Sequence, residues 1–365
     1  MKRGPIASPG LPRANLWLFP QFLGRCRSIS QVRNQRIKTV RTGVVIDSAC
    51  DLPQAYIQSH GIHIMPINLH FGYDIFKDVR DPEATQAFYR KYLTEKTLDA
   101  ETAPFSVEQI RAMFLDELVL KYDRVLVVTI SQARSAIFAN ATEASFGILK
   151  QYRERRQKAG MSGSFYLSVL DSKTLFAGQG VLVHEAIRLL EEQNFSFGAL
   201  RNVTDQLSQQ VHGYLVPEDL FYLRYRGSKK GEKTVGLLSY HFGSLLDIKP
   251  IIGFHQGESQ VVAKERGFDQ AMIKLFEIAR QAIDGGLATR IINTSYAGDP
   301  EVIRRKRAFV DFERYANAHG ITVLLSVMST TAGVNVGPGA FALAYIAGPP
   351  LATVAGPDAN ATTNG

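Results

Sequence analysis

Two apolar runs in this chain end on the same pair of polar residues. The stretch VVIDSACDLP stops on Asp47-Ser48, and the stretch YLSVLDSKTLF stops on Asp171-Ser172. A third run, RVLVVTIS, ends on Ser131. If these runs are parallel strands of one sheet, their carboxyl ends meet at the edge where α/β folds bind ligands. The short polar side chains would then either cap the following turns or line a ligand-binding cleft.

Familiar catalytic and metal-binding patterns are absent from the sequence. There is no HExxH pair, and neither Ser48 nor Ser172 lies in a G-x-S-x-G turn. The two cysteines fit no disulfide framework or metal motif. The GQG stretch at 178–180 resembles a dinucleotide-binding loop only weakly, because the third glycine is not at the required spacing. We therefore expect no catalytic residue, no metal site and no cofactor.

Hydroxyl groups and backbone amides above an apolar interior favour binding over catalysis. They suit a ligand with one small anionic head and a long apolar body. Two alternatives remain open. One is an enzyme that acts on an acyl or phosphate ester through Asp47-Ser48 and Asp171-Ser172, which would need a base or a metal. The other is a regulatory binding module whose basic N-terminal segment contacts a membrane or nucleic acid.

The basic charge of the chain is concentrated in its first segment. Residues 1–41 contain nine Lys or Arg and no Asp or Glu, so the remaining 324 residues carry about −1 of the total charge of +8. A near-neutral body argues against specific nucleic-acid binding. We interpret 1–41 as a basic, disordered extension, with targeting as the alternative, and 349–365 as a flexible tail. No charge-free apolar run of membrane-spanning length is present, and we expect a cytoplasmic protein.

Strands and helices are expected to alternate in the first half of the chain. Apolar or β-branched runs predict strands at 44–46, 63–72, 124–131 and 165–172. A capping box formed by Ser106 and Gln109 predicts the start of a helix. Further helices are expected at about 135–155 and 178–191. This alternation is typical of a mostly parallel sheet with helical crossovers.

The second half of the chain has a different pattern. Two strands around a Gln256-Gly257 turn, within 251–266, predict an antiparallel hairpin. A helix is expected at 269–283, a strand at 290–295, and another helix that starts with Asp299 as N-cap and Pro300 in its first turn. We therefore predict two α/β domains, 42–205 with a mostly parallel sheet and 206–348 with a mixed sheet.

Five segments, taken in order, resemble the DegV family of fatty-acid-binding proteins. They are VVIDSACDLP, HGIHIMPINLHFG, LDSKTLFAGQGVLVHEA, GSLLDIKPII and GPGAFALAY, and the similarity covers about residues 42–348. The resemblance implies two α/β domains with a long-chain fatty acid in a tunnel between them. It also implies a carrier without catalytic activity of its own, which in some members delivers the acyl chain to a separate fatty acid kinase.

The family motifs carry over to this chain in part. The resemblance implies that Thr102 and Ser135 donate hydrogen bonds to the fatty acid carboxylate, with Ser131 nearby. Tyr296 stands where the family has a histidine that contacts the head group. Arg134 is one of several departures from the motif around Ser135. Six apolar residues are candidates for the tunnel wall: Phe71, Phe105, Ile137, Phe138, Phe242 and Leu246.

Overall fold

The computed structural model describes residues 40–71, 73–93, 100–192, 195–230 and 247–349. The two predicted tails therefore fall almost entirely outside the described residues. In the part of the chain that is described, no helix is both long enough and apolar enough to cross a membrane.

A four-stranded parallel sheet forms the first part of the fold, as the sequence predicts. Its strand order is β2-β1-β6-β7, and every neighbouring pair is parallel. The strands are β1 (Thr42–Asp47), β2 (His63–Met65), β6 (Arg124–Thr129) and β7 (Tyr166–Asp171). Because all four run in the same direction, the polar residues that follow β1, β6 and β7 come together at one edge.

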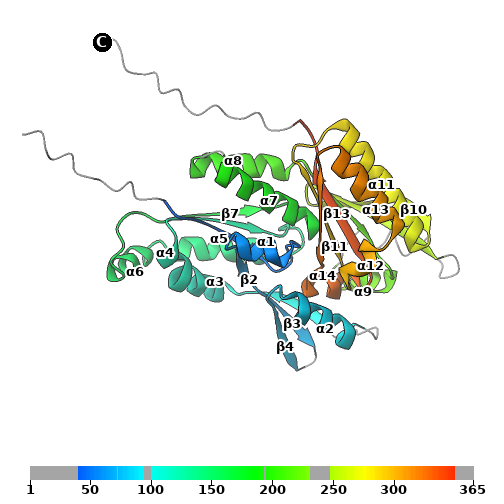
Figure 1. The fold of residues 1–365 in the computed structure, drawn as a ribbon. Coiled ribbons are helices and arrows are strands. Elements are labelled where there is room, and N and C mark those ends of the chain that lie inside the picture. The colour runs from blue at the N-terminus through cyan, green and yellow to red at the C-terminus, as the bar shows by residue number, and fades with distance from the viewer. Residues whose placement is uncertain (1–39, 72, 94–99, 193–194, 231–246, 350–365) are drawn as a thin grey trace, which may run out of the picture. The chain divides into compact units, whose positions relative to one another are not determined.

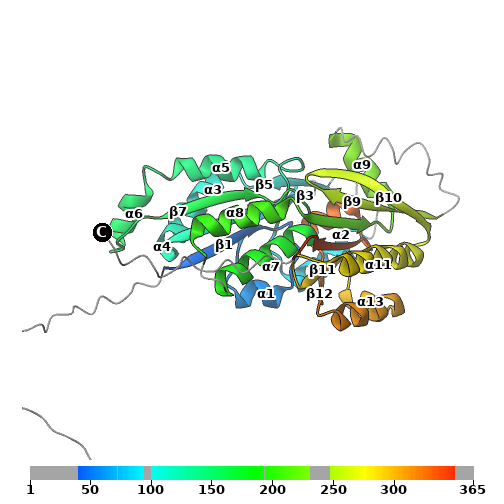
Figure 2. The same cartoon turned by 90° about the horizontal axis from the view of Figure 1, so that it is seen from above.

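Helices cover both faces of this parallel sheet. α7 and α8 lie on one side of β7, and α3 and α5 lie on its other side (Figures 1 and 2). The bounds are α3 (Val107–Met113), α5 (Ile137–Gly147), α7 (Ala177–Glu192) and α8 (Phe197–Ser208). The strands are consequently buried on both faces, which explains why they read as continuous apolar runs rather than alternating ones.

Two of the predicted helices differ in detail from the observed ones. The capping box at Ser106 is present, since its side chain accepts from the Gln109 amide at 3.3 Å and its own amide donates to the Gln109 side chain at 2.9 Å. The helix then continues through a π-helical turn at Phe114–Leu118 into α4 (Val119–Lys121). The helix predicted over 135–155 is interrupted, because a turn separates α5 from α6 (Tyr152–Lys158).

The strand predicted over 63–72 is in fact two strands in two different sheets. Pro66, which has no N–H to donate to a ladder, separates β2 from β3 (Ile67–Phe71). β3 is the centre of a small antiparallel sheet with β4 (Asp74–Asp78) and β5 (Ala100–Pro104). This third sheet was not predicted from the sequence. In the chain, α2 (Pro82–Tyr92) lies between β4 and β5, and α1 (Gln54–Ser59) follows β1.

A six-stranded mixed sheet forms the second part of the fold, again as predicted. Its order is β10-β9-β8-β13-β11-β12, with only β11 and β12 parallel. The strands are β8 (Val211–Val216), β9 (Ile248–His255), β10 (Glu258–Arg266), β11 (Ile291–Tyr296), β12 (Thr322–Val327) and β13 (Phe341–Ile346). The predicted hairpin is β9–β10, and its turn residues Gln256 and Gly257 both have positive φ, at 51° and 83°. Positive φ at both positions is the signature of a type I′ hairpin turn.

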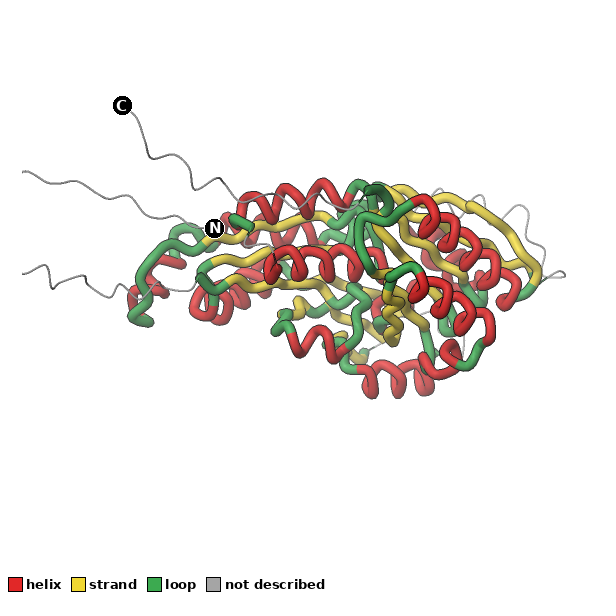
Figure 3. Tube along the Cα trace, turned by 45° about the horizontal axis from the view of Figure 1, so that its top comes forward, coloured by secondary structure: helices red, strands yellow, loops and turns green. Residues whose placement is uncertain are grey.

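The mixed sheet is covered by helices on its outer face and by α7 on its inner face. α11 (Phe268–Gly285) and α13 (Arg307–Ala318) pack against each other and lie outside the sheet (Figures 1 and 3). The helix predicted to start after Asp299 is again two helices, α12 (Pro300–Arg304) and α13, because Lys306 has extended backbone. The remaining helices in the described ranges are α9 (Leu220–Lys230) and α14 (Thr330–Val336).

The strands of the different sheets lie on opposite sides of the proposed domain boundary in the sequence, but one apolar core extends across that boundary. β1–β7 lie before residue 205 and β8–β13 after it. α7 nevertheless packs against β13, β11 and β8 as well as β6, and one apolar cluster continues from the parallel sheet to the inner face of the mixed sheet. The boundary near 205 remains a prediction.

Candidate functional site

An apolar cavity lies where the strand-end loops of the parallel sheet approach the mixed sheet and α14. Its volume is about 280 Å³, near the lower end of typical small-molecule sites. Most of the lining side chains are apolar: Ile67, Pro104, Ile130, Ala136, Leu175, Phe176, Leu215, Leu223, Phe254 and Val336. The polar ones are Thr102, Arg134, Ser135, Thr331 and Asn335. The cavity thus combines an apolar body with a few hydrogen-bonding groups.

Thr102 and Ser135, the two head-group residues expected from the sequence, line this same cavity. Thr102 is in β5, where it pairs with Leu69 of the central strand of the small sheet. Ser135 is in the loop between β6 and α5. The two segments are joined by Asn140 of α5, whose side chain donates to the Phe105 carbonyl just after β5 at 2.8 Å.

The strand-end aspartates hold the loop that carries Ser135. The Ile130 amide donates to Oδ2 of Asp47 at 2.6 Å, and the Gln132 amide donates to Oδ1 of Asp171 at 3.1 Å. A carboxylate that accepts backbone N–H groups in this way fixes the course of a turn. Asp47 and Asp171 therefore position the cavity wall rather than line it.

The serines that follow these aspartates also form hydrogen bonds to the backbone of nearby segments. Ser48 Oγ accepts from the Ile67 amide at 2.8 Å, directly after Pro66. Ser172 Oγ donates to the Thr174 carbonyl at 3.3 Å. None of the Asp-Ser residues lines the cavity, so of the two roles left open by the sequence, the structure supports turn formation.

Burial of Asp47 changes its acid–base behaviour. Its side chain is fully buried, and desolvation raises the pKa to about 6, although hydrogen bonds from Ile130, Ala49 and Gln179 lower it in part. Gln179 belongs to the GQG stretch, and its Nε2 also donates to the Val128 carbonyl at 3.1 Å.

The glycines of the GQG stretch permit close packing of α7. A Cβ on Gly178 would collide with the Thr174 side chain, and one on Gly180 would collide with the Asp51 carbonyl and the Asn293 side chain. The stretch therefore packs α7 against both halves of the fold, which accounts for its glycines without a nucleotide.

The tip of the β9–β10 hairpin closes over the same loop region. The Gly257 amide donates to the Lys173 carbonyl at 2.7 Å. Arg134 Nη2 donates to Ser259 Oγ at 2.8 Å. The second half of the chain thereby contacts the loop after β7 at Lys173 and the loop after β6 at Arg134.

The other two predicted site residues lie outside the cavity lining. Ser131 is buried, and its Oγ accepts from the Ala133 amide at 3.3 Å within the loop. Tyr296, at the end of β11, lines a different cavity together with Glu218, Phe268 and Lys306. Its pKa is raised by desolvation and by the negative charges of Glu218 and Asp299.

The residues predicted for the tunnel wall are not among those that line this cavity. Phe71, Phe105, Ile137 and Phe138 do not line the cavity, and Phe242 and Leu246 lie outside the described residues. Phe71 instead packs in an aromatic cluster with Phe76, Phe88 and Tyr92. These apolar side chains could not be distinguished from core by sequence, because core and tunnel wall have the same composition.

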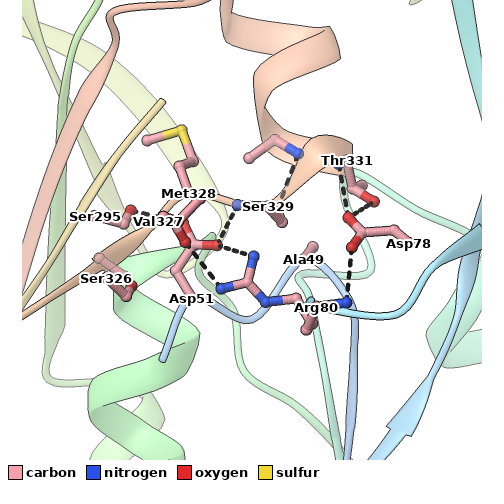
Figure 4. Close-up of polar contacts among 12 residues, drawn as sticks. Ala49, Asp51, Asp78, Arg80, Ser295, Ser326, Val327, Met328, Ser329 and Thr331 are labelled. Atoms are coloured by element: carbon pink, nitrogen blue, oxygen red, sulfur yellow. Dashed lines mark hydrogen bonds and ion pairs between the residues drawn. The ribbon is translucent and has the colours of Figure 1, made fainter. Parts of the chain in front are cut away.

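A buried polar network joins the two halves of the fold beside the cavity (Figure 4). Asp51 forms an ion pair with Arg80, with 3.2 Å between Oδ1 and Nη1. Asp51 also accepts from Ser295 Oγ at 2.6 Å and from the Ser329 amide at 2.9 Å. Desolvation raises the pKa of Asp51, and the Arg80 charge opposes that shift.

A second carboxylate extends this network to the cavity wall. Asp78 Oδ1 accepts from the Arg80 amide at 3.1 Å, and its Oδ2 accepts from the amide and hydroxyl of Thr331, both at 2.8 Å. Thr331 is in α14 and lines the cavity. Within the described ranges, no group of three or more His, Cys, Asp or Glu side chains is arranged to hold a metal ion.

Together, the fold and the cavity define a two-part α/β protein with a mostly apolar site between a parallel and a mixed sheet. A family model described as "Uncharacterised protein, DegV family" matches residues 41–348. The chain therefore belongs to the DegV family.

Relatives and solved structures agree with this assignment. A DegV domain-containing protein of Xanthomonas axonopodis pv. citri is 43% identical over 310 residues, which cover 85% of this chain and 98% of that protein. A DegV lipid-binding protein of Thermotoga maritima has the same fold, with a TM-score of 0.67 and 20% identity over 84% of this chain and 98% of that one. DegV of Bacillus subtilis, a fatty-acid-binding protein, gives a TM-score of 0.66 and 19% identity over 85% of this chain and 100% of that one.

Proposed function

We propose that this protein binds one long-chain fatty acid in the apolar cavity and presents its carboxylate at the wall formed by Thr102 and Ser135. The observation that carries the proposal is that both of these hydroxyl residues line one cavity whose walls are mostly apolar. The lipid-binding and fatty-acid-binding relatives of the same fold support it.

The energetics of such a ligand favour an apolar site with few polar contacts. Each buried methylene contributes about 0.8 kcal/mol, so a tail of about 15 methylenes supplies roughly 12 kcal/mol before the ordering costs of binding. The head group then needs hydrogen-bond donors that offset its desolvation. Hydroxyls from two different segments can provide them.

We further propose a non-catalytic, cytoplasmic carrier that needs no cofactor and hands the acyl chain to a separate fatty acid kinase. The strand-end Asp-Ser residues, which an enzyme would have used, are engaged in holding loops. A mixture of this protein, palmitic acid and ATP should yield acyl phosphate only when a fatty acid kinase is added. Acyl phosphate formed by this protein alone would contradict the proposal.

Replacing both hydroxyl residues should weaken fatty acid binding. In Thr102→Val with Ser135→Ala, the volumes are nearly unchanged but two donors are lost, so we expect affinity to fall at least about tenfold. The measurement is palmitic acid binding by calorimetry, with mass spectrometry of an organic extract from the purified protein under denaturing conditions.

The matched control for the double variant is Thr322→Val with Ser164→Ala, because both residues are exposed and neither lines the cavity. The control should bind like the wild type. Equal fatty acid content in the wild type and the double cavity variant would show that these hydroxyls do not hold the head group.

A further inference from the structure

Arg134 is the one charged residue among the described residues that line the cavity. It precedes Ser135 in the loop after β6, at a position where the sequence departs from the family motif. Its side chain is half-buried. A cationic group in the wall of a mostly apolar cavity is costly unless it bonds to a partner or a ligand.

The position of the Arg134 side chain is set by the other half of the fold. Nη2 donates to Ser259 Oγ of β10 at 2.8 Å, and the hairpin that carries Ser259 is itself held by the bond from Gly257 to the Lys173 carbonyl. A guanidinium has five N–H donors in a planar fork. It can therefore bond a serine hydroxyl and an anionic group at the same time.

We propose that Arg134 determines head-group specificity by selecting an anionic head over a neutral head on the same apolar tail. This inference rests on the proposed fatty acid function. Hydroxyls such as those of Thr102 and Ser135 can hydrogen-bond to an acid, an alcohol or an ester alike. A guanidinium adds a charge-assisted bond to a carboxylate that a neutral head group cannot form.

The position of Arg134 also suggests a purely structural role, which is to tie the β6–α5 loop to the hairpin. The two roles have different consequences. Loss of a structural tie would weaken binding of every ligand equally, because it would disturb the whole cavity. Loss of a specificity contact would weaken binding of the acid alone.

The test compares palmitic acid with 1-hexadecanol, which has the same chain length, at about pH 8, far above a carboxyl pKa of about 4. In Arg134→Gln we expect acid affinity to fall about tenfold or more, because a charge-assisted bond is lost. Alcohol affinity should change by less than about twofold, and Arg134→Lys should keep part of the preference for the acid. An acid-to-alcohol ratio in Arg134→Gln equal to that of the wild type would overturn the inference.

Two further variants complete this experiment. Arg307→Gln removes a charge from an arginine whose side chain is 95% exposed and should leave the ratio unchanged. If Ser259 positions the guanidinium, Ser259→Ala should lower the acid-to-alcohol affinity ratio in part. Ser259→Thr, which keeps the hydroxyl, should restore that ratio. If the wild type binds neither palmitic acid nor 1-hexadecanol, the proposed function fails. If the wild type and Arg134→Gln both bind the acid with the same acid-to-alcohol affinity ratio, only the role of Arg134 is refuted.

Discussion

Replacing Arg80 with methionine should lower the free energy of unfolding by about 3–5 kcal/mol at neutral pH, the cost typical of removing one partner of a buried ion pair. The side chains of Arg80 and Asp51 are only 4% and 0% exposed. Methionine fills similar volume without charge, so the substitution leaves the Asp51 carboxylate buried with only Ser295 and the Ser329 amide as hydrogen-bond donors.

The backbone at residue 80 should not contribute to this loss. Arg80 has a φ of 61°, in the left-handed region, and methionine would occupy it at a similar cost. The Asp78 carboxylate, which accepts from the residue 80 amide, is also retained. The effect therefore isolates the side-chain charge and the bond from Nη2 to the Val327 carbonyl.

Chemical denaturation of the wild type and Arg80→Met measures this effect. Arg307→Met is the matched control, because it breaks an exposed pair with Asp311 and should cost less than about 1 kcal/mol. Asp51→Asn combined with Arg80→Met should recover part of the loss, since no unpaired charge remains. An Arg80→Met protein within about 1 kcal/mol of the wild type would show that the pair does not stabilise the junction.

The junction also explains how distant segments form one cavity. Asp51 and Arg80 come from the first half of the chain, whereas Ser295, Val327 and Thr331 come from the second. The network orients α14, which contributes Thr331, Asn335 and Val336 to the cavity. This network was not predictable from the sequence, because an ion pair or hydrogen bond between residues from different sheets has no local pattern.

Features with a local cause were predictable. The capping box at Ser106 and the turn at Gln256-Gly257 depend on neighbouring residues, and both are present. The shared edge of Asp47 and Asp171 followed from parallel strand direction. The antiparallel sheet around β3 was missed, because one apolar run spans Pro66 and gives no sign that its two parts enter different sheets.

The candidate site was only partly readable from the sequence. Thr102 and Ser135 were found through the family motifs, and they line one cavity. Arg134 was noted only as a departure from the family motif around Ser135. A charged residue next to a hydroxyl residue at a strand end was the feature of the sequence that could have indicated a role in the site. Apolar wall residues gave no signal, since Leu215 or Phe254 would serve equally well in a core.

Asp47 should make the stability of the protein depend on pH in a direction opposite to that of most carboxylates. Its folded pKa of about 6 lies above the ordinary value of 3.8, because desolvation outweighs the hydrogen bonds to the carboxylate. Between these two values the folded state binds more protons than the unfolded state. Stability contributed by Asp47 is therefore fully present below about pH 4 and is lost as pH rises through about 6.

The comparison with Asp47→Asn isolates this effect, because asparagine does not titrate. The wild type should be more stable than the variant at low pH, because both oxygens of a protonated carboxyl group can still accept hydrogen bonds from Ile130, Ala49 and Gln179. The amide nitrogen of asparagine cannot accept any of them. The difference in unfolding free energy between the two proteins should shrink by about 2–3 kcal/mol between about pH 4 and pH 7. Asp116→Asn, at an exposed residue, controls for the change in net charge.

The direction of this change is what tests the role of Asp47. Suppose instead that the three surrounding donors stabilise the carboxylate more than burial destabilises it. The difference in unfolding free energy between the wild type and Asp47→Asn would then increase as pH rises. A difference that becomes smaller as pH rises would show that desolvation outweighs the hydrogen bonds. The ionised carboxylate that bonds to the loop carrying Arg134 and Ser135 would then destabilise the folded state. Because the Ile130 amide bonds to this carboxylate, ionisation of Asp47 acts at the base of the cavity wall.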